Sequence, residues 1–348
     1  MKRFLLCALG LAATLWSWSC VSTAASSPMV EETAKRARVV VVHDAQATVL
    51  FTPEPERVPP MIERAMTNLT GKASTTEAWL SLVSTQETVG LKVFSRPGPT
   101  SGTRPAVVEA LVKSLLAAGL PARQIIVWDR SIADLRQAGF FSLAEHYGVR
   151  VAGSAEAGYD EKTFYESALL GQLSWGDLEF GQTGAGVGRK SHVSKLVFGM
   201  DKIITVTPLL NHNLAGVSGS LYGLAMGSVD NTIRFELDAN ALADAVPDIL
   251  ALDVLYDRLT LHIVDALICQ YQGEERQLLH YSTALNELWV SRDPVAVDVL
   301  AIEELERQRR AAMVTSAKPS FKLYQNASLV WLGVSTPRQI DVIRVPVR

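Results

Sequence analysis

The chain has 348 residues, of which 48% are hydrophobic and 20% are charged, and its formal net charge is −3 at pH 7. This composition is too apolar for a disordered chain, and the length allows one large domain or two. The charge balance is slightly acidic and no basic stripe is interleaved with aromatic residues, so nucleic acid is not an expected partner.

The first 25 residues differ from the rest of the chain. Two basic residues precede an apolar run over positions 4–16, and small residues suited to cleavage follow at 22–25. This is the layout of a secretory signal peptide, so we expect export to a bacterial periplasm, with an uncleaved anchor as the alternative. A lipoprotein attached through Cys20 is less favoured, because the bulky Trp18 fits a lipidation site poorly. After removal of the signal we expect no membrane span, since no later apolar run is long enough.

The three cysteines limit the cofactors that the chain can hold. Cys7 and Cys20 fall in or beside the predicted signal, which leaves Cys269. One cysteine cannot form an internal disulfide, hold an iron–sulfur cluster or build a structural zinc site. We therefore expect no iron–sulfur cluster, and Cys269 is expected to be a small buried residue rather than a nucleophile.

Residues 26–84 are expected to form strands and helices that pack on a main domain at 85–348. The runs Arg38–His43 and Ala47–Phe51 predict two strands, the first covered on both faces. Four prolines between positions 53 and 60 predict a turn that leads into a helix over 61–69. Thr75-Thr76-Glu77 then predicts the cap of a short helix.

The main domain begins with a β–loop–α–β pattern. Val89–Phe94 predicts a strand, and the loop SRPGPTSGTRP follows it. Pro105 suits a first helical turn and apolar residues recur after it at helical spacing, until Ile125–Trp128 predicts the next strand. This order favours a mainly parallel sheet with a right-handed crossover. Residues 150–200, rich in glycine, serine and aromatic residues, predict an irregular excursion away from the sheet.

We expect the rest of the chain to be organised around the stretch Lys202–Gly227. Ile203–Val206 predicts a buried strand, which we expect Pro208 to end. A polar elbow at 211–213 and an apolar helical run at 221–226 follow. A strand, a polar turn and a helix start together form the usual ligand crevice of an open α/β sheet, so we expect a crevice here.

The remaining elements complete an α/β pattern. They are a helix over 239–255, strands at Leu259–Leu267 and Leu285–Val290, a helix from Pro294 to about Arg310, a helix near 321–332 and a strand at Ile340–Val345. The predicted fold is a mainly parallel or mixed sheet with helices on both faces.

Several polar residues stand at the carboxyl ends of predicted strands or just after them. Charged side chains are rarely buried without partners, so these residues predict a shared polar crevice. They are Lys92, Asp129, Arg130, His212, Asp265 and Asp293. Alternatives stay open for four of them: Asp129 and Asp293 can simply cap helices, Lys92 can face solvent, and His212 can be a structural histidine. A carboxylate within IVDAL, at Asp265, needs a partner because its strand is apolar.

Five segments, in order, resemble the bacterial family called domain of unknown function 362. They are VGLKVF, PAVVEALVKSLLAAGLPARQIIVWDRSIADLRQAGF, DKIITVTPLLNHNLAGVSGSLYG, LTLHIVDAL and LWVSRDPVAVDVLA. The resemblance spans roughly residues 85 to 345. It implies no particular reaction, because the activity of the family is not generally established.

The resemblance also marks which family positions this chain keeps. The matching residues are Lys92, Asp129, Arg130, His212, Gly216, Asp265, Asp293 and Asp298. The departures are Phe94 for asparagine, Arg104 for histidine, Leu210 for lysine, Tyr222-Gly223 for a lysine–asparagine pair, and Gly273-Glu274-Glu275 for a glycine-rich stretch. The chain thus keeps carboxylates and one histidine of the family pattern and lacks two lysines and an Asn–His pair.

Three functions follow from this comparison. The first, which we favour, is a non-catalytic member that binds a small polar or anionic ligand, with candidate ligand-binding residues Lys92, Arg104, Asp129, Arg130, Asn211, His212, Tyr222 and Asp293. The second is a periplasmic enzyme in which His212 is a general acid/base oriented by Asp265 or Asp293, with a divalent metal held by carboxylates as an open alternative. The third is a protein-interaction module with a vestigial crevice.

Overall fold

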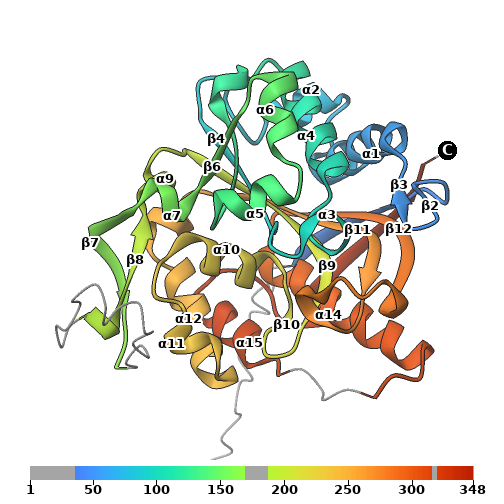
Figure 1. The fold of residues 1–348 in the computed structure, drawn as a ribbon. Coiled ribbons are helices and arrows are strands. Elements are labelled where there is room, and N and C mark those ends of the chain that lie inside the picture. The colour runs from blue at the N-terminus through green and yellow to red at the C-terminus, as the bar shows by residue number, and fades with distance from the viewer. Residues whose placement is uncertain (1–35, 169–186, 316–319, 348) are drawn as a thin grey trace, which may run out of the picture. The chain divides into compact units, whose positions relative to one another are not determined.

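The central element of the fold is a sheet that, within the described residues, has nine strands (Figure 1). The computed structural model describes residues 36–168, 187–315 and 320–347, so the predicted signal peptide lies outside the described residues. The strand order is β13-β1-β12-β11-β9-β4-β5-β6, and β10 pairs with β9. The strands are β1 (Ala37–His43), β4 (Val89–Val93), β5 (Ile125–Asp129), β6 (Arg150–Gly153), β9 (Lys202–His212), β10 (Gly216–Val217), β11 (Leu259–Gln270), β12 (Ser282–Ser291) and β13 (Ile340–Pro346).

The sheet is mixed but mostly parallel. Strand β12 is antiparallel to both of its neighbours, β11 and β1. The other pairs along the main path are parallel. The carboxyl ends of β11, β9, β4 and β5 therefore meet at one edge, while the carboxyl end of β12 lies at the opposite edge.

Helices cover both faces of this sheet (Figure 1). Along β1, Val39 and Val41 face one core and Val40 and Val42 face the other, as the period of two in a strand requires. The first core includes α10 (Ser220–Ser228), α12 (Ala239–Leu250), α14 (Pro294–Ala311) and α15 (Lys322–Leu329). The second includes α1 (Val58–Thr70), α2 (Thr75–Leu80), α4 (Pro105–Ala117) and α6 (Phe141–Tyr147). The predicted α/β fold, with helices on both faces, is confirmed.

Shorter elements join these layers. They are the hairpin β2 (Thr48–Val49) and β3 (Thr52–Pro53), and the short helices α3 (Gly98–Ser101), α5 (Ile132–Gln137), α7 (Ser154–Ala157), α9 (Lys195–Phe198), α11 (Ile233–Glu236) and α13 (Asp253–Tyr256). No helix in the described ranges is long and apolar enough to cross a membrane.

The prediction that Pro208 ends its strand is wrong. Strand β9 continues to His212, and Pro208 lies opposite Asp265 of β11. The pairing of β9 with β11 becomes irregular directly after this position, and β4 pairs with β9 only as far as Val206. A proline has no N–H to donate, and it is tolerated where the ladder is interrupted in this way.

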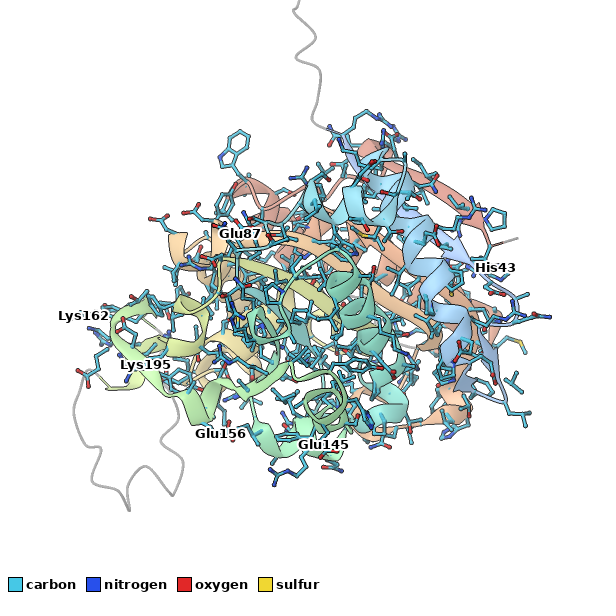
Figure 2. The ribbon with its side chains drawn as sticks, turned by 90° about the horizontal axis from the view of Figure 1, so that it is seen from above. His43, Glu87, Glu145, Glu156, Lys162 and Lys195 are labelled. Atoms are coloured by element: carbon cyan, nitrogen blue, oxygen red, sulfur yellow. The ribbon has the colours of Figure 1, made fainter. Side chains whose placement is uncertain are left out.

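Two other segments differ from their predicted structure. Ala47–Phe51 is not one strand, because Leu50 and Phe51 take positive φ angles of 48° and 60° and form the turn of the hairpin β2–β3. The region 150–200 includes β6, which pairs with β5 in the main sheet. Beyond β6, the described part of the region does leave the sheet, in the separate pair β7 (Tyr159–Glu166) and β8 (Lys190–Ser194). Figure 2 shows Lys162 and Lys195 on this side of the molecule and His43 at the opposite side.

A buried polar chain joins the sheet to the start of α10. The Thr205 hydroxyl lies 2.9 Å from Nδ1 of His262 and donates to the Ser220 hydroxyl at 3.0 Å. Asp298 of α14 then accepts from the backbone N–H groups of Ser220 and Leu221, at 2.8 and 2.9 Å. Burial raises the pKa of Asp298 to about 7, although these two N–H donors oppose the rise. The first turn of α10 is thus held by a side chain of another helix.

Candidate functional site

The candidate site is the crevice at the carboxyl ends of β4 and β9. From β4 the chain passes to β5 on one side, while β9 pairs with β4 on the other side. Helix α4 follows β4 on one face of the sheet, and α10 follows β9 on the other face. A switch point of this kind is where open α/β sheets place ligands.

Lys92 lies inside this crevice, where its charge is balanced by an ion pair with Asp129. Its side chain is 1% exposed, and Nζ donates at 2.7 Å both to Oδ1 of Asp129 and to the carbonyl oxygen of Val93. Asp129 also accepts from the N–H and the hydroxyl of Ser95, both at 2.7 Å, and from the N–H of Arg130 at 2.8 Å. The pair is buried and well satisfied, so neither charge is available to a ligand without breaking it.

Helix α10 packs directly against the Lys92 side chain at Gly227. A Cβ at Gly227 would lie 2.1 Å from Cε of Lys92, whereas a Cβ at Gly223, one turn earlier, would lie 3.6 Å from the nearest atom of Phe94. We expect Gly227→Ala to lower the free energy of unfolding by about 1–3 kcal/mol, because Lys92 cannot move without losing Asp129. Gly223→Ala is the matched control and is expected to be neutral or to stabilise by up to about 1 kcal/mol. Equal urea midpoints for the two variants would show that Lys92 is free to move.

Arg104 and Asp265 form a second buried ion pair, before α4. Arg104 is 2% exposed and Asp265 is 0% exposed. Nη1 of Arg104 lies 2.9 Å from Oδ1 of Asp265, which is an ionic contact rather than a directed hydrogen bond. Nη2 of Arg104 donates to the carbonyl oxygens of Thr100 and Ile268. Asp265 accepts from the N–H groups of Arg104 and Leu267. The carboxylate is therefore held by Arg104, and it is not placed to orient His212.

His212 ends β9 and is a neutral, packed side chain. Its Nδ1 accepts from the N–H groups of Leu214 and Ala215, at 3.3 and 3.0 Å, so the ring proton is on Nε2. The ring lies against Tyr222, with centroids 4.2 Å apart. Burial lowers the pKa of His212, while the charges of Glu274 and Glu236 oppose this shift. Burial raises the pKa of the Tyr222 hydroxyl, and the negative charges of Glu236 and Glu275 raise it further.

Two other predicted ligand residues have structural contacts. Oδ1 of Asn211 accepts from the N–H of Glu274 at 2.9 Å and so fixes the loop that follows β11. Asp293 caps α14, because its carboxylate accepts from the N–H groups of Ala296 and Val334 at 2.8 and 3.0 Å. Since β12 is antiparallel, Asp293 lies at the opposite edge of the sheet from His212. The expectation that all these residues share one crevice therefore fails for Asp293.

Little space remains inside the crevice. The rings of Phe94 and Tyr222 are tilted against each other with centroids 6.4 Å apart, and they are 7% and 8% exposed. The cavity beside them has a volume of about 40 Å³. That volume holds water but not a substrate.

The rim of the same cavity carries charged residues that were not among the predicted ligand residues, apart from Arg130. Arg96, after β4, lies 3.0 Å from Glu275, and Arg130, after β5, lies 3.5 Å from Glu236. The arginine side chains are 66% and 42% exposed. Burial raises the pKa values of Glu275 and Asp134, and neighbouring carboxylates raise them further. The mouth of the crevice is thus lined by both signs of charge.

The described residues include no group of three or more histidine, cysteine or acidic side chains placed to hold a metal ion. Cys269 is buried, as predicted, and burial raises the pKa of its thiol.

The pattern of the family described as Domain of unknown function (DUF362) matches residues 89–303, which is more than half of the chain. The chain belongs to this family. The predicted resemblance is thereby confirmed, and every crevice residue described above lies within the matched range. None of the curated proteins matches the chain significantly.

Two solved structures are distantly similar to this DUF362 member. One is the crystal structure of a protein from Thermotoga maritima, with a TM-score of 0.42, 13% identity, and coverage of 74% of this chain and 59% of that one. Another is the lactate racemase apoprotein from Thermoanaerobacterium thermosaccharolyticum, with a TM-score of 0.35, 14% identity, and coverage of 65% and 50%. The chain thus matches between half and three fifths of the length of these two proteins.

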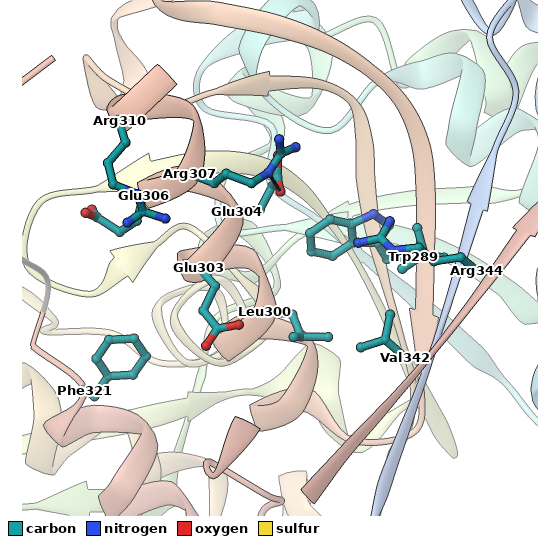
Figure 3. A pocket seen from close by; sticks show the side chains of 11 residues that line it. Trp289, Leu300, Glu303, Glu304, Glu306, Arg307, Arg310, Phe321, Val342 and Arg344 are labelled. Atoms are coloured by element: carbon teal, nitrogen blue, oxygen red, sulfur yellow. Dashed lines mark hydrogen bonds and ion pairs between the residues drawn. The ribbon is translucent and has the colours of Figure 1, made fainter. Parts of the chain in front are cut away.

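A larger hollow in this DUF362 protein lies away from the crevice (Figure 3). It has a volume of about 560 Å³ and lies between α14 and the strands β12, β1 and β13. Arg307 pairs there with Glu304 at 2.6 Å, and Arg344 pairs with Glu287 at 3.1 Å. None of the predicted site residues lines it. The crevice remains the better candidate, because it combines the switch point with the family residues.

Two of the rim residues of the crevice stand in segments that sequence patterns already marked. Arg96 stands in the loop SRPGPTSGTRP, which was expected to follow β4, and Glu275 stands after the strand that carries Asp265. Glu236 belongs to α11, and no motif marks it. Only the packing of α11 against α12 brings it to the crevice, where it lines the cavity.

Proposed function

We propose that this protein is a non-catalytic member of its family that binds a small zwitterion at the rim of the crevice. The observation that carries the proposal is the contrast between two sets of cations. Lys92 and Arg104 are 1% and 2% exposed and locked in buried ion pairs, whereas Arg96 and Arg130 are exposed at the mouth. Only the second pair is available to a ligand that arrives from solvent.

The charge of the mouth favours a ligand with both signs. The cavity is lined by Arg96 and Arg130 together with Asp134, Glu236 and Glu275. A simple anion would be repelled by the three carboxylates, and the charges of Asp134 and Glu236 already add to the effect of burial in raising the pKa of Glu275. A ligand that presents a carboxylate to the arginines and an ammonium group to the acids satisfies both sets.

The rim ion pairs can exchange partners at low cost. Exposed ion pairs contribute about 0–1 kcal/mol, so a zwitterion loses little by replacing Arg96–Glu275 and Arg130–Glu236 with its own contacts. The enzyme alternative is less supported, because Nδ1 of His212 already accepts from two backbone N–H groups and cannot take up a proton without losing them. No carboxylate contact orients this imidazole within the described residues.

A thermal-shift experiment on the full chain tests the proposal. We expect small amino acids to raise the melting temperature saturably, because they bind the folded state, whereas acetate and methylamine at the same concentrations raise it less. Arg130→Ala and Glu236→Gln are each expected to remove most of the shift.

Arg123→Ala is the matched control for Arg130→Ala. Arg123 is exposed at the start of β5, at the other end of the strand from Asp129, and it makes no ion pair in the described part of the chain. Equal shifts in Arg123→Ala and Arg130→Ala would contradict binding at the rim. A shift produced by acetate alone would indicate an anion site instead.

A further inference from the structure

A second hollow lies at the opposite edge of the sheet, where β1 begins and β12 ends. Its volume is about 530 Å³, and its lining includes Arg36, Arg38 and Arg292, with Leu69 and Leu332 as apolar walls. Both leucines are buried. None of these residues belongs to the crevice.

The strand register brings two of the arginines side by side. Strands β1 and β12 pair antiparallel with Val39 opposite Ser291, and the Ser291 hydroxyl donates to the carbonyl oxygen of Arg38 at 2.8 Å. The next residues outward in this register are Arg38 and Arg292. Like charges on facing positions of neighbouring strands repel and destabilise the pair.

The carboxylates near these arginines, Asp341 and Asp293, already bind other groups. Asp341 of β13 pairs with Arg36, and Arg38 acts on Asp341 only as a more distant charge. Asp293 also lines the hollow, and its two oxygens accept from backbone N–H groups. Within the described ranges, the guanidinium groups of Arg38 and Arg292 form no hydrogen bond or ion pair. Two neighbouring cations thus face a cavity whose nearby carboxylates, Asp293 and Asp341, are already bound to other groups.

We propose that this hollow binds a phosphate group between Arg38 and Arg292. A guanidinium donates two parallel N–H groups to a phosphate, and a doubly charged phosphate can take such a fork from each arginine at once. The apolar walls keep water away from one side of the site and so strengthen the charge interaction. Bound phosphate also removes the repulsion between the two arginines, which the free protein has to tolerate.

The phosphate can belong to a soluble ester or to a lipid headgroup, and two probes distinguish them. Inorganic phosphate and glycerol phosphate are titrated into the full chain by calorimetry at constant ionic strength. Vesicles of phosphatidylcholine with and without phosphatidic acid are tested by co-sedimentation. We expect saturable binding of inorganic phosphate; vesicle binding that requires phosphatidic acid would assign a lipid source, and tighter binding of glycerol phosphate without vesicle binding would assign a soluble one.

Variants separate this site from general charge effects. Arg38→Ala and Arg292→Ala are each expected to weaken phosphate binding about tenfold or more, since each removes a charged fork. Arg292→Glu is expected to abolish binding and also to raise the melting temperature of the free protein, because it places opposite charges on facing strand positions. Arg310→Ala, at an exposed arginine of α14 outside this hollow, is expected to bind phosphate as the wild type does.

Three results would overturn the proposal. They are the absence of binding of all three phosphate probes, equal affinity in the wild type and Arg38→Ala, and a loss of affinity in Arg310→Ala as large as that in Arg292→Ala. The thermal measurement on Arg292→Glu guards against misfolding, since an unfolded variant would lose the cooperative transition instead of shifting it upward.

Discussion

Asp265→Ala is expected to lower the free energy of unfolding by about 3–5 kcal/mol, the usual cost of removing one partner of a buried ion pair. The substitution leaves the guanidinium of Arg104, 2% exposed, without its counter-charge. It also removes the acceptor for the N–H groups of Arg104 and Leu267. Urea denaturation measures the change. Because domains of this size commonly unfold at about 5–15 kcal/mol, the variant is expected to remain folded.

The exposed pair Arg96–Glu275 gives the matched control for this prediction. Glu275→Ala breaks an ion pair of similar length, 3.0 Å, at the surface, where the expected loss is only about 0–1 kcal/mol. The double variant Arg104→Met/Asp265→Leu is expected to recover part of the loss of Asp265→Ala, because it removes the unpaired charge. A loss in Asp265→Ala no larger than that in Glu275→Ala would mean that water reaches the inner pair.

Acidification is expected to remove a contribution of His262 to stability before most carboxylates titrate, whereas Asp298, with its pKa raised to about 7, contributes in the opposite direction. His262 is 0% exposed, and burial lowers its pKa to about 3. The unfolded chain takes up a proton on this histidine below about pH 6.5, whereas the folded chain does not do so until about pH 3. The stability contributed by the neutral ring is therefore complete above pH 6.5. It is lost by about 1.4 kcal/mol per pH unit as the pH falls, or about 4–5 kcal/mol at pH 3.

The contribution of His262 is isolated by comparing slopes between pH 6.5 and 5. As the pH falls through this range, His262→Gln is expected to lose less unfolding free energy than the wild type, by about 1 kcal/mol per unit, and the comparison cancels the opposite contribution of Asp298. His43→Gln is the control, since His43 is exposed at the end of β1 and is expected to keep the wild-type slope. Identical slopes in the wild type and His262→Gln would show that the buried ring is protonated in the folded protein.

Most of the regular elements could be predicted from the sequence, because they follow from local patterns. The valine run within 38–43 and the mainly apolar run at 259–267 are strands of the sheet, and the helical spacing after Pro105 and Pro294 corresponds to α4 and α14. The two local failures have specific causes. Pro208 lies where the pairing of β9 is interrupted, and Leu50 and Phe51 take positive φ angles that their side chains do not signal.

The candidate site was harder to predict because it depends on strand direction and on pairing. Lys92, Asp129 and His212 do lie at one edge, as expected for parallel strands, but Asp293 does not, because β12 runs the other way. The sequence also could not tell that Lys92 is neutralised by Asp129 and Arg104 by Asp265. Both pairings join residues far apart in the chain. They change the inner cations from candidate ligand residues into buried structural groups.

Isothermal titration calorimetry of the full chain with small amino acids tests the central claim most directly. The predicted result is one saturable binding isotherm, with the heat returning to baseline after each injection, and a loss of this isotherm in Arg130→Ala but not in Arg123→Ala. Heat that continues after each injection would reveal turnover and would contradict a non-catalytic crevice. The absence of any binding heat across the set would contradict a zwitterion site at its rim.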